Sequence, residues 1–156
     1  MKQKKAGKRR NWQNPNPTVD VAITDGHRVV LIQRANEPFK GQWVFPGGFV
    51  EYDERVEDAA IREAKEETSL DVKLVEILGV YSDPHRDPRA HNISVVFVGK
   101  RIEGEVMGGD DAAAAEWRNL KDLMPDDLAF DHGLILQDLK SWLKDSSMTF
   151  WSAKER

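Results

Sequence analysis

The feature that most restricts how this chain can fold is a run of acidic residues that follows two adjacent glycines, Gly47 and Gly48. An α-helix turns by about 100° per residue, so Glu63 and Glu67 project from the same side of a helix that starts near Val56. Small apolar residues share that side, which should therefore face the protein body. They are Ala59, Ala60 and Ala64.

Carboxylates that face the interior need a cationic partner, because burying an unpaired ion costs several kcal/mol. Mg²⁺ or Mn²⁺ suits this pattern, since both take all-oxygen ligands whereas zinc prefers His and Cys. Glu66 flanks the same side of the helix. The alternative is an ordinary surface helix, because Glu is a strong helix former.

The spacing around the helix resembles the Nudix box, the signature of a family of hydrolases that act on nucleoside-diphosphate-linked compounds. The matching positions are Gly48, Glu54, Arg62, Glu63, Ala64, Glu66, Glu67 and Leu70. Only Ser69 departs from the pattern, because the family has glycine there. That glycine normally ends the helix in a left-handed conformation, in which Ser should cost roughly 1 kcal/mol.

The resemblance implies an α/β protein with the Nudix fold, in which a mixed β-sheet is sandwiched between helices in an α/β/α arrangement. It also implies a metal site and a nearby brace. The expected metal ligands are Glu63 and Glu67, with Glu66 as a ligand or acting through water, and the Gly47 carbonyl. Gly48 should let the backbone approach the ion, and Arg62 should form a forked ion pair with Glu54 that holds the loop against the helix.

The catalytic base is less clearly marked. Asp111 lies in a loop before Trp117, where related enzymes often have a carboxylate near the metals, and it is the predicted base. Glu66 and Glu116 are the alternatives. The Gly-Asp cluster is also typical of a simple polar turn.

A second segment, residues 81–91, reads YSDPHRDPRAH and predicts a stiff loop with two Asp-Pro steps. Its arginines carry forked donors that suit phosphates. Together with NPxPTVDV, GxWVFPGGFVE and LAFDH elsewhere, it resembles the bacterial and archaeal ADP-ribose pyrophosphatase branch of the Nudix hydrolases, over residues 14–139. The expected substrate-binding residues are Arg34, Asp83, Arg86 and Arg89, although a charged surface loop and a surface arginine are the simpler readings.

The resemblance implies hydrolysis of ADP-ribose to AMP and ribose 5-phosphate. A Nudix pyrophosphatase acting on an oxidised nucleotide, a dinucleoside polyphosphate or NADH stays open, because the Nudix box addresses only diphosphate and metal. A non-catalytic regulator that senses ADP-ribose is a third possibility. The intact helix glutamates favour turnover, and about a dozen residues after the domain are fewer than a DNA-binding module needs.

The 156 residues predict one domain. We expect a flexible basic arm at 1–13, the Nudix domain at 14–145 and a C-terminal tail at 146–156. Strands are predicted at 18–24 and 28–33, joined as a hairpin by Asp25-Gly26, then at 43–45, 72–80, 93–101 and briefly near Trp117. A helix is predicted at 132–144 after Asp131 as its cap, and Asp53 is the predicted cap of the acidic helix.

The absence of cysteine fits a reducing cytoplasm, and no apolar run approaches a membrane span. The first ten residues carry a charge of +6 and the rest −10. An acidic body argues against a stable nucleic-acid partner, so the expected partner is a small nucleotide. Trp142, Phe150 and Trp151 raise the possibility of a homodimer, since related enzymes often dimerise.

Overall fold

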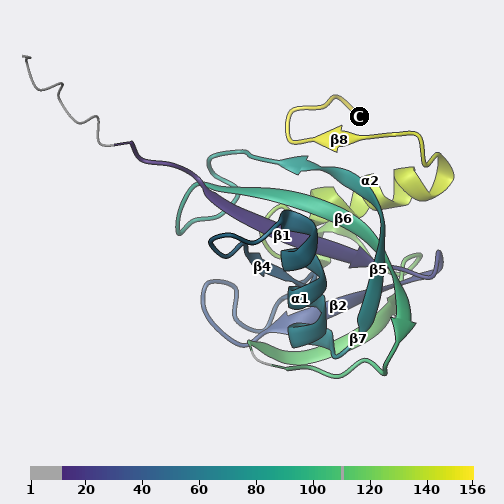
Figure 1. The fold of residues 1–156 in the computed structure, drawn as a ribbon. Helices are drawn as coiled ribbons and strands as arrows, with labels where there is room; N and C mark the ends of the chain where they lie inside the picture. The colour runs from purple at the N-terminus through teal and green to yellow at the C-terminus, as the bar shows by residue number, and fades with distance from the viewer. Residues whose placement is uncertain (1–11, 110) are drawn as a thin grey trace, which may run out of the picture.

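The computed structural model describes residues 12–109 and 111–156 (Figure 1). Its strands form a five-stranded sheet, in the order β4-β1-β6-β5-β8, and a three-stranded sheet, in the order β3-β2-β7. The strands are β1 (Asn16–Ile23), β2 (Arg28–Arg34), β3 (Trp43–Val44), β4 (Gly47–Phe49), β5 (Asp71–Tyr81), β6 (Asn92–Glu103), β7 (Ala112–Asn119) and β8 (Phe150–Trp151). The helices are α1 (Val56–Thr68), the short 3-10 helix η1 (Pro125–Asp127) and α2 (His132–Lys144).

The two α-helices cover opposite faces of the five-stranded sheet. Because side chains alternate along a strand, Val19 and Val21 of β1 pack with the alanines of α1, whereas Ala22 packs in the cluster that contains Leu136 and Leu139 of α2. The predicted α/β/α arrangement is confirmed. The strands divide between two sheets, however, and do not form the single mixed sheet that was expected.

Helix α1 lies as its periodicity predicts. Its three inward alanines are completely buried, and Ser69 follows the helix in the left-handed region, with φ 64° and ψ 6°. The predicted cap was wrong. Arg55, not Asp53, precedes the first turn and makes no side-chain cap bond, while Asp53 itself has φ 62° in the preceding turn.

Other boundaries depend on tertiary pairing. The Asp25-Gly26 turn forms, but β1 and β2 enter different sheets and only Thr24 bridges Val29. Strand β7 is longer than the short strand predicted near Trp117, because it pairs with β2 along its length. Helix α2 has the predicted bounds. Asp131 precedes it but makes no cap bond.

The segment expected to be a C-terminal tail contains β8, which pairs in parallel with the end of β5. Phe150 is buried in the core cluster beside α2, so this part of the chain belongs to the folded body. Most of the predicted basic arm, residues 1–11, lies outside the described residues. Within the described ranges, no helix is long and apolar enough to cross a membrane.

Candidate active site

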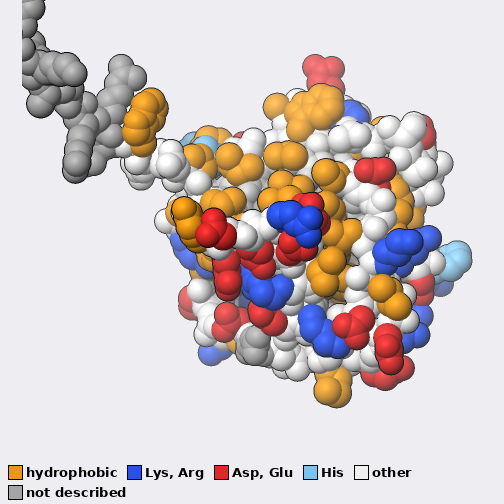
Figure 2. All heavy atoms as spheres, viewed as in Figure 1, with side chains coloured by type: hydrophobic (Ala, Val, Ile, Leu, Met, Phe, Trp, Pro, Cys, Tyr) orange, Lys and Arg blue, Asp and Glu red, His pale blue; other side chains and the backbone are white. Residues whose placement is uncertain are grey.

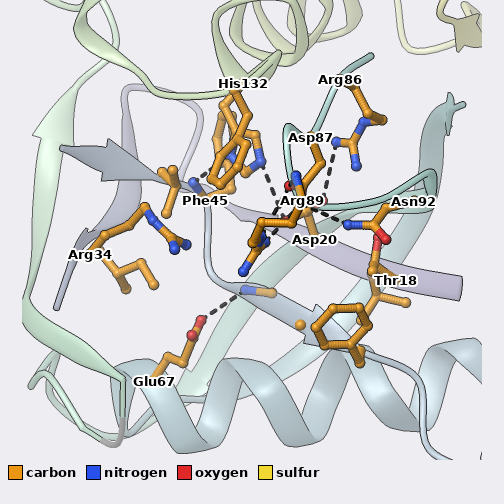
Figure 3. Close-up of a pocket in the computed structure, with 17 residues that line it drawn as sticks. Thr18, Asp20, Arg34, Phe45, Glu67, Arg86, Asp87, Arg89, Asn92 and His132 are labelled. Carbon is orange, nitrogen blue, oxygen red and sulfur yellow. Dashed lines mark hydrogen bonds and ion pairs between the residues drawn. The ribbon is translucent and has the colours of Figure 1, made fainter. Parts of the chain in front are cut away.

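The acidic face of α1 lies directly against the glycine strand β4. The Gly47 amide donates to Oε2 of Glu67 at 2.8 Å, as the close-up shows (Figure 3). A side chain at Gly48 would collide with the carboxylate of Glu63. Glycine at this position therefore lets the carboxylate of the metal-ligand candidate lie where a Cβ would otherwise displace it.

Arg62 and Glu54 form the forked ion pair that the sequence predicts. Nε and Nη2 of Arg62 donate to the two Glu54 oxygens at 2.8 and 2.9 Å. The fork lowers the pKa of Glu54 to about 2. Nη2 also donates to the Phe49 carbonyl at 3.0 Å, so this one guanidinium ties α1 to the end of β4 and to the following loop.

The same guanidinium reaches the helix carboxylates. Nη1 of Arg62 lies 2.8 Å from Oε1 of Glu63 and 3.2 Å from Oε2 of Glu66. Acidic side chains gather around α1 and β4 on this face of the molecule (Figure 2). Arg62 thus partly neutralises Glu63 and Glu66 and fixes their orientation.

Among residues 12–109 and 111–156, no arginine or lysine forms an ion pair with Glu67. Its burial raises its pKa to about 8, and repulsion from Glu63, Asp20 and Asp111 acts in the same direction against the Gly47 hydrogen bond. Burial also raises the pKa of Glu63, although Arg62 opposes the shift. Two carboxylates that burial makes hard to ionise lie side by side here, so a cation bound between them would stabilise their charged forms.

The donor chemistry fits a hard divalent cation. Glu63 and Glu67 present carboxylate oxygens from successive turns of one helix face, and Mg²⁺ is often bound by one or two carboxylates while keeping several waters. Within residues 12–109 and 111–156, no group of three His, Cys, Asp or Glu side chains is already arranged to hold a metal. The two helix carboxylates could supply part of a coordination shell, with water and phosphate supplying the rest.

Two contiguous cavities open beside these carboxylates. An outer cavity of about 330 Å³ is lined by Arg34, Glu63, Glu67, Arg89 and Asp111, among others. An inner cavity of about 90 Å³ shares Arg34, Glu67 and Arg89 with it. Cations and carboxylates thus face each other across the same space, which suits an anionic ligand bound together with a metal ion.

The loop carboxylate Asp111 lies in the outer cavity with Glu63 and Glu67. It accepts a hydrogen bond from the Asn36 side chain at 3.3 Å, and its charge contributes to the raised pKa of Glu67. Glu116 instead pairs with Arg118 at 3.1 Å and lines neither cavity. Asp110 lies outside the described residues.

The four predicted substrate residues separate into two groups. Arg34 and Arg89 line both cavities. Their guanidinium carbons lie 5.0 and 5.7 Å from the ring centre of Phe130. Arg34 and Arg89 are therefore placed to meet an anionic ligand.

Arg86 and Asp83 are engaged by other groups of the protein. The fork of Arg86 is occupied by Asp131, at 2.8 and 2.7 Å, and the side chain is only 6% exposed. Arg86 is therefore a structural brace in the wall of the inner cavity. Asp83 accepts from the His85 amide and lines neither of the two cavities. The partner of Arg86 lies 45 positions away in the sequence, whereas Asp83 is engaged in a local turn with a residue two positions on.

The inner cavity also contains a buried polar pair that the sequence pattern did not single out. Nε2 of His132 lies 3.6 Å from Oδ1 of Asp20, and Nδ1 of His132 accepts from the Phe45 amide at 3.0 Å. Burial raises the pKa of Asp20 and lowers that of His132. The available signal was Asp20 itself, an acidic residue within a valine-rich strand.

The site combines the acidic helix α1, the glycine strand β4 and a cavity that is also lined by arginines. This combination is typical of a protein that binds an anion next to a cation. The NUDIX domain model matches residues 14–139, so the chain belongs to the Nudix family. It is 47% identical over 142 residues to an ADP-ribose pyrophosphatase of Methanocaldococcus jannaschii, covering 91% of this chain and 83% of that protein.

Two solved structures carry ligands at related folds. The Nudix domain of Shewanella oneidensis NrtR, complexed with ADP ribose, has a TM-score of 0.74 and 28% identity, covering 85% of this chain and 90% of that one. A bifunctional NMN adenylyltransferase/ADP ribose pyrophosphatase of Francisella tularensis, complexed with AMP and a manganese ion, has a TM-score of 0.73 and 26% identity. The match covers 85% of this chain and 43% of that chain.

Proposed function

We propose that this protein is a Nudix pyrophosphatase that hydrolyses ADP-ribose to AMP and ribose 5-phosphate with Mg²⁺ or Mn²⁺. The proposal rests on one observation: two carboxylates and two guanidinium groups line the same cavity. They belong to Glu63, Glu67, Arg34 and Arg89. A diphosphate needs both the arginines and a metal ion bound by the carboxylates, because its negative charge must be neutralised before a nucleophile can approach. The 47% identity to an ADP-ribose pyrophosphatase over most of the chain supports the choice of substrate.

Each residue then has a defined task. Glu63 and Glu67 would hold the cation, with Glu66 acting as a further ligand or through water, and Gly47 is the proposed source of a backbone carbonyl. A bound divalent ion would screen the phosphates and lower the pKa of a water molecule. Arg34 and Arg89 place positive charge beside the diphosphate, each held in position by its own fork: Arg34 donates to the Pro38 and Asn36 carbonyls and Arg89 to the Asp87 carboxylate.

Asp111 is the proposed base. It accepts the proton of the water whose oxygen bonds to one phosphorus, while the bond from that phosphorus to the bridging oxygen breaks. The electron pair of the broken bond stays on the bridging oxygen, which leaves with the other phosphate. Arg62 and Glu54 keep the helix carboxylates in register with β4 during this step.

The test is a substrate panel with purified protein and Mg²⁺: ADP-ribose, NADH, 8-oxo-dGTP and diadenosine polyphosphates, with products separated by chromatography. We expect kcat/KM for ADP-ribose to exceed the others by at least about tenfold, which corresponds to about 1.4 kcal/mol of transition-state preference. Equal or faster cleavage of 8-oxo-dGTP would refute the assignment.

Product release also separates an enzyme from a regulator. ADP-ribose binding without AMP formation in Mg²⁺ would indicate a sensing protein, whereas AMP formation that Glu67→Gln abolishes would indicate turnover. A cytoplasmic location and a homodimer remain predictions from the sequence. Fractionation of cells and light scattering of the purified protein would test them.

A further inference from the structure

The C-terminal segment, residues 150–156, lies beside the loop that forms one wall of the candidate active site. That loop, residues 82–91, joins β5 to β6 and is here called the cavity loop. It carries Arg86, Asp87 and Arg89, all of which line the inner cavity. In Figure 1 the last stretch of chain runs over α2 next to the end of β5, where the cavity loop begins.

The first contact is a strand pairing that ends at the loop. Gly79 and Val80 of β5 pair with Phe150 and Trp151 of β8. A side chain at Gly79 would collide with the Phe150 carbonyl, so this close approach requires glycine. The C-terminal segment is therefore seated within two residues of the loop.

The second contact is a hydroxyl that caps the start of the loop. Oγ of Ser152 accepts from the Ser82 amide at 2.8 Å and from the Asp83 amide at 3.2 Å. These two amides are the first of the cavity loop. One serine side chain thus fixes the direction in which the backbone leaves β5.

The third contact is a buried carboxylate that joins three elements. Asp138 of α2 is 1% exposed and accepts from the Tyr81 hydroxyl at 2.7 Å. Nε and Nη2 of Arg156 donate to its two oxygens at 2.8 and 2.6 Å. Tyr81 is the residue directly before the cavity loop, so Arg156 and Asp138 immobilise the position from which the loop starts.

The far end of the loop is held differently. Asp87 accepts from Asn92 at 2.7 Å and forms a forked pair with Arg89, at 3.0 and 2.7 Å. Within the described residues, side chains from outside the loop hold it at three places: Ser152 at the first two amides, Asp131 at Arg86 and Asn92 at Asp87. The placement of Arg89 at the cavity therefore depends on these anchors together, and the first of them belongs to the C-terminal segment.

We propose that residues 150–156 form a strap that positions the cavity loop for substrate, with Ser152 and Arg156 as positioning residues that do not touch the substrate. The importance of the loop for catalysis rests on the proposed function. The strap itself is defined by contacts within the protein and can be measured without substrate. Release of the strap should loosen the loop and weaken substrate binding, while the carboxylates on α1 keep their arrangement.

The test uses the full chain and two readouts. In Ser152→Ala, hydrogen exchange of the 82–83 amides should become at least about tenfold faster, because both lose their acceptor. KM for ADP-ribose should rise about threefold to tenfold with kcat within about twofold of wild type. Ser152→Thr keeps the hydroxyl and should restore both values.

Ser147→Ala is the matched control, because Ser147 lies in the same C-terminal region but bonds only to Asp145 in its own turn. It should change neither readout. Arg156→Gln is the second variant and should loosen the loop further, while Arg156→Lys, which keeps the charge without the fork, should fall between Arg156→Gln and wild type.

The outcomes separate the two proposals. Unchanged exchange at 82–83 in both Ser152→Ala and Arg156→Gln would overturn the strap. Faster exchange with unchanged KM would overturn its role in positioning. If wild-type protein did not cleave ADP-ribose, the proposed function would fail, and the exchange measurement would still decide whether the strap exists.

Discussion

The helix end at Ser69 allows a quantitative test of how sequence determines this fold. Ser69 has φ 64° and ψ 6°, a left-handed conformation that costs a residue with a Cβ about 1–2 kcal/mol. Replacement by Gly removes that cost but gives the unfolded chain more freedom, which offsets about 0.4–1 kcal/mol. The Ser69 hydroxyl makes only a long bond of 3.4 Å to the Met107 carbonyl. We therefore expect Ser69→Gly to raise the free energy of unfolding by about 0.5–1 kcal/mol.

The expected change in melting temperature follows from the length of the chain. For 156 residues, the unfolding entropy is about 330 cal/mol/K near 60 °C, so the variant should melt about 2–3 °C higher. Differential scanning calorimetry at one pH, with a metal chelator present, measures this directly. The kcat should not change, because Ser69 lines neither cavity of the site.

Ser69→Ala is the matched control. It keeps the strained backbone and loses the hydroxyl, so its melting temperature should equal that of wild type or lie slightly below it. If the Gly variant melts no higher than the Ala variant, the left-handed conformation is not costing the protein stability and the reasoning is refuted.

Three further predictions concern the site. Burial raises the pKa of Glu67 to about 8, and a group whose pKa is raised in the folded state stabilises the protein at low pH, so the chelator-treated protein should lose about 3–4 kcal/mol of stability as the pH rises from 5 to 9. Chemical denaturation of wild type should show this loss, and the same loss in Glu67→Gln would contradict the assignment. Asp111→Asn should lower kcat more than about tenfold, while Glu116→Gln, whose carboxylate pairs with Arg118 outside the cavities, should not. A loss under tenfold in Asp111→Asn would exclude this base. Arg62→Lys cannot reproduce the fork to Glu54 and should lower kcat/KM about tenfold or more. The control is Arg55→Lys, at the exposed Arg55–Asp58 fork, whose kcat/KM should stay within about twofold of wild type. Equal effects of the two variants would show that the Arg62–Glu54 pair has no special role.

The acidic helix was predictable because its determinants are local. Helical periodicity alone places Glu63 and Glu67 on the side of the buried alanines, and the structure has them there. The Arg62–Glu54 pair spans eight residues and was found through the spacing of the Nudix box. Both are features that neighbouring positions in the sequence specify together.

The walls of the site were less predictable because their partners are distant in sequence. Arg86 has the residue type and loop context of a phosphate ligand, yet Asp131 lies 45 positions away and occupies its fork. Nothing in the local pattern marks that pairing. His132 likewise has no spacing in the sequence that marks it as a ligand, although the fold brings it to Asp20 in the inner cavity.

Strand boundaries failed for the same physical reason. Four consecutive alanines have low intrinsic strand preference, and β7 begins among them because β2 supplies a pairing edge. Strand β8 has only two residues, too few for any periodicity. Its existence depends on the edge of β5, and so does the strap that we propose.

Positive charge is distributed unevenly around the carboxylates of α1, and this explains how the same helix can be stabilised by an arginine and still bind a cation. Arg62 is already shared among Glu54, Glu63 and Glu66, whereas Glu67 receives only an amide hydrogen bond. A cation that enters the site therefore interacts most favourably with Glu67, and it must displace any proton bound to that carboxylate. Metal ligands bind in their deprotonated form, so metal affinity should increase as the pH rises toward 8 and level off above it. Arg62 secures the helix before the ion arrives, and Glu67 is the carboxylate left for the ion to bind once its proton is lost.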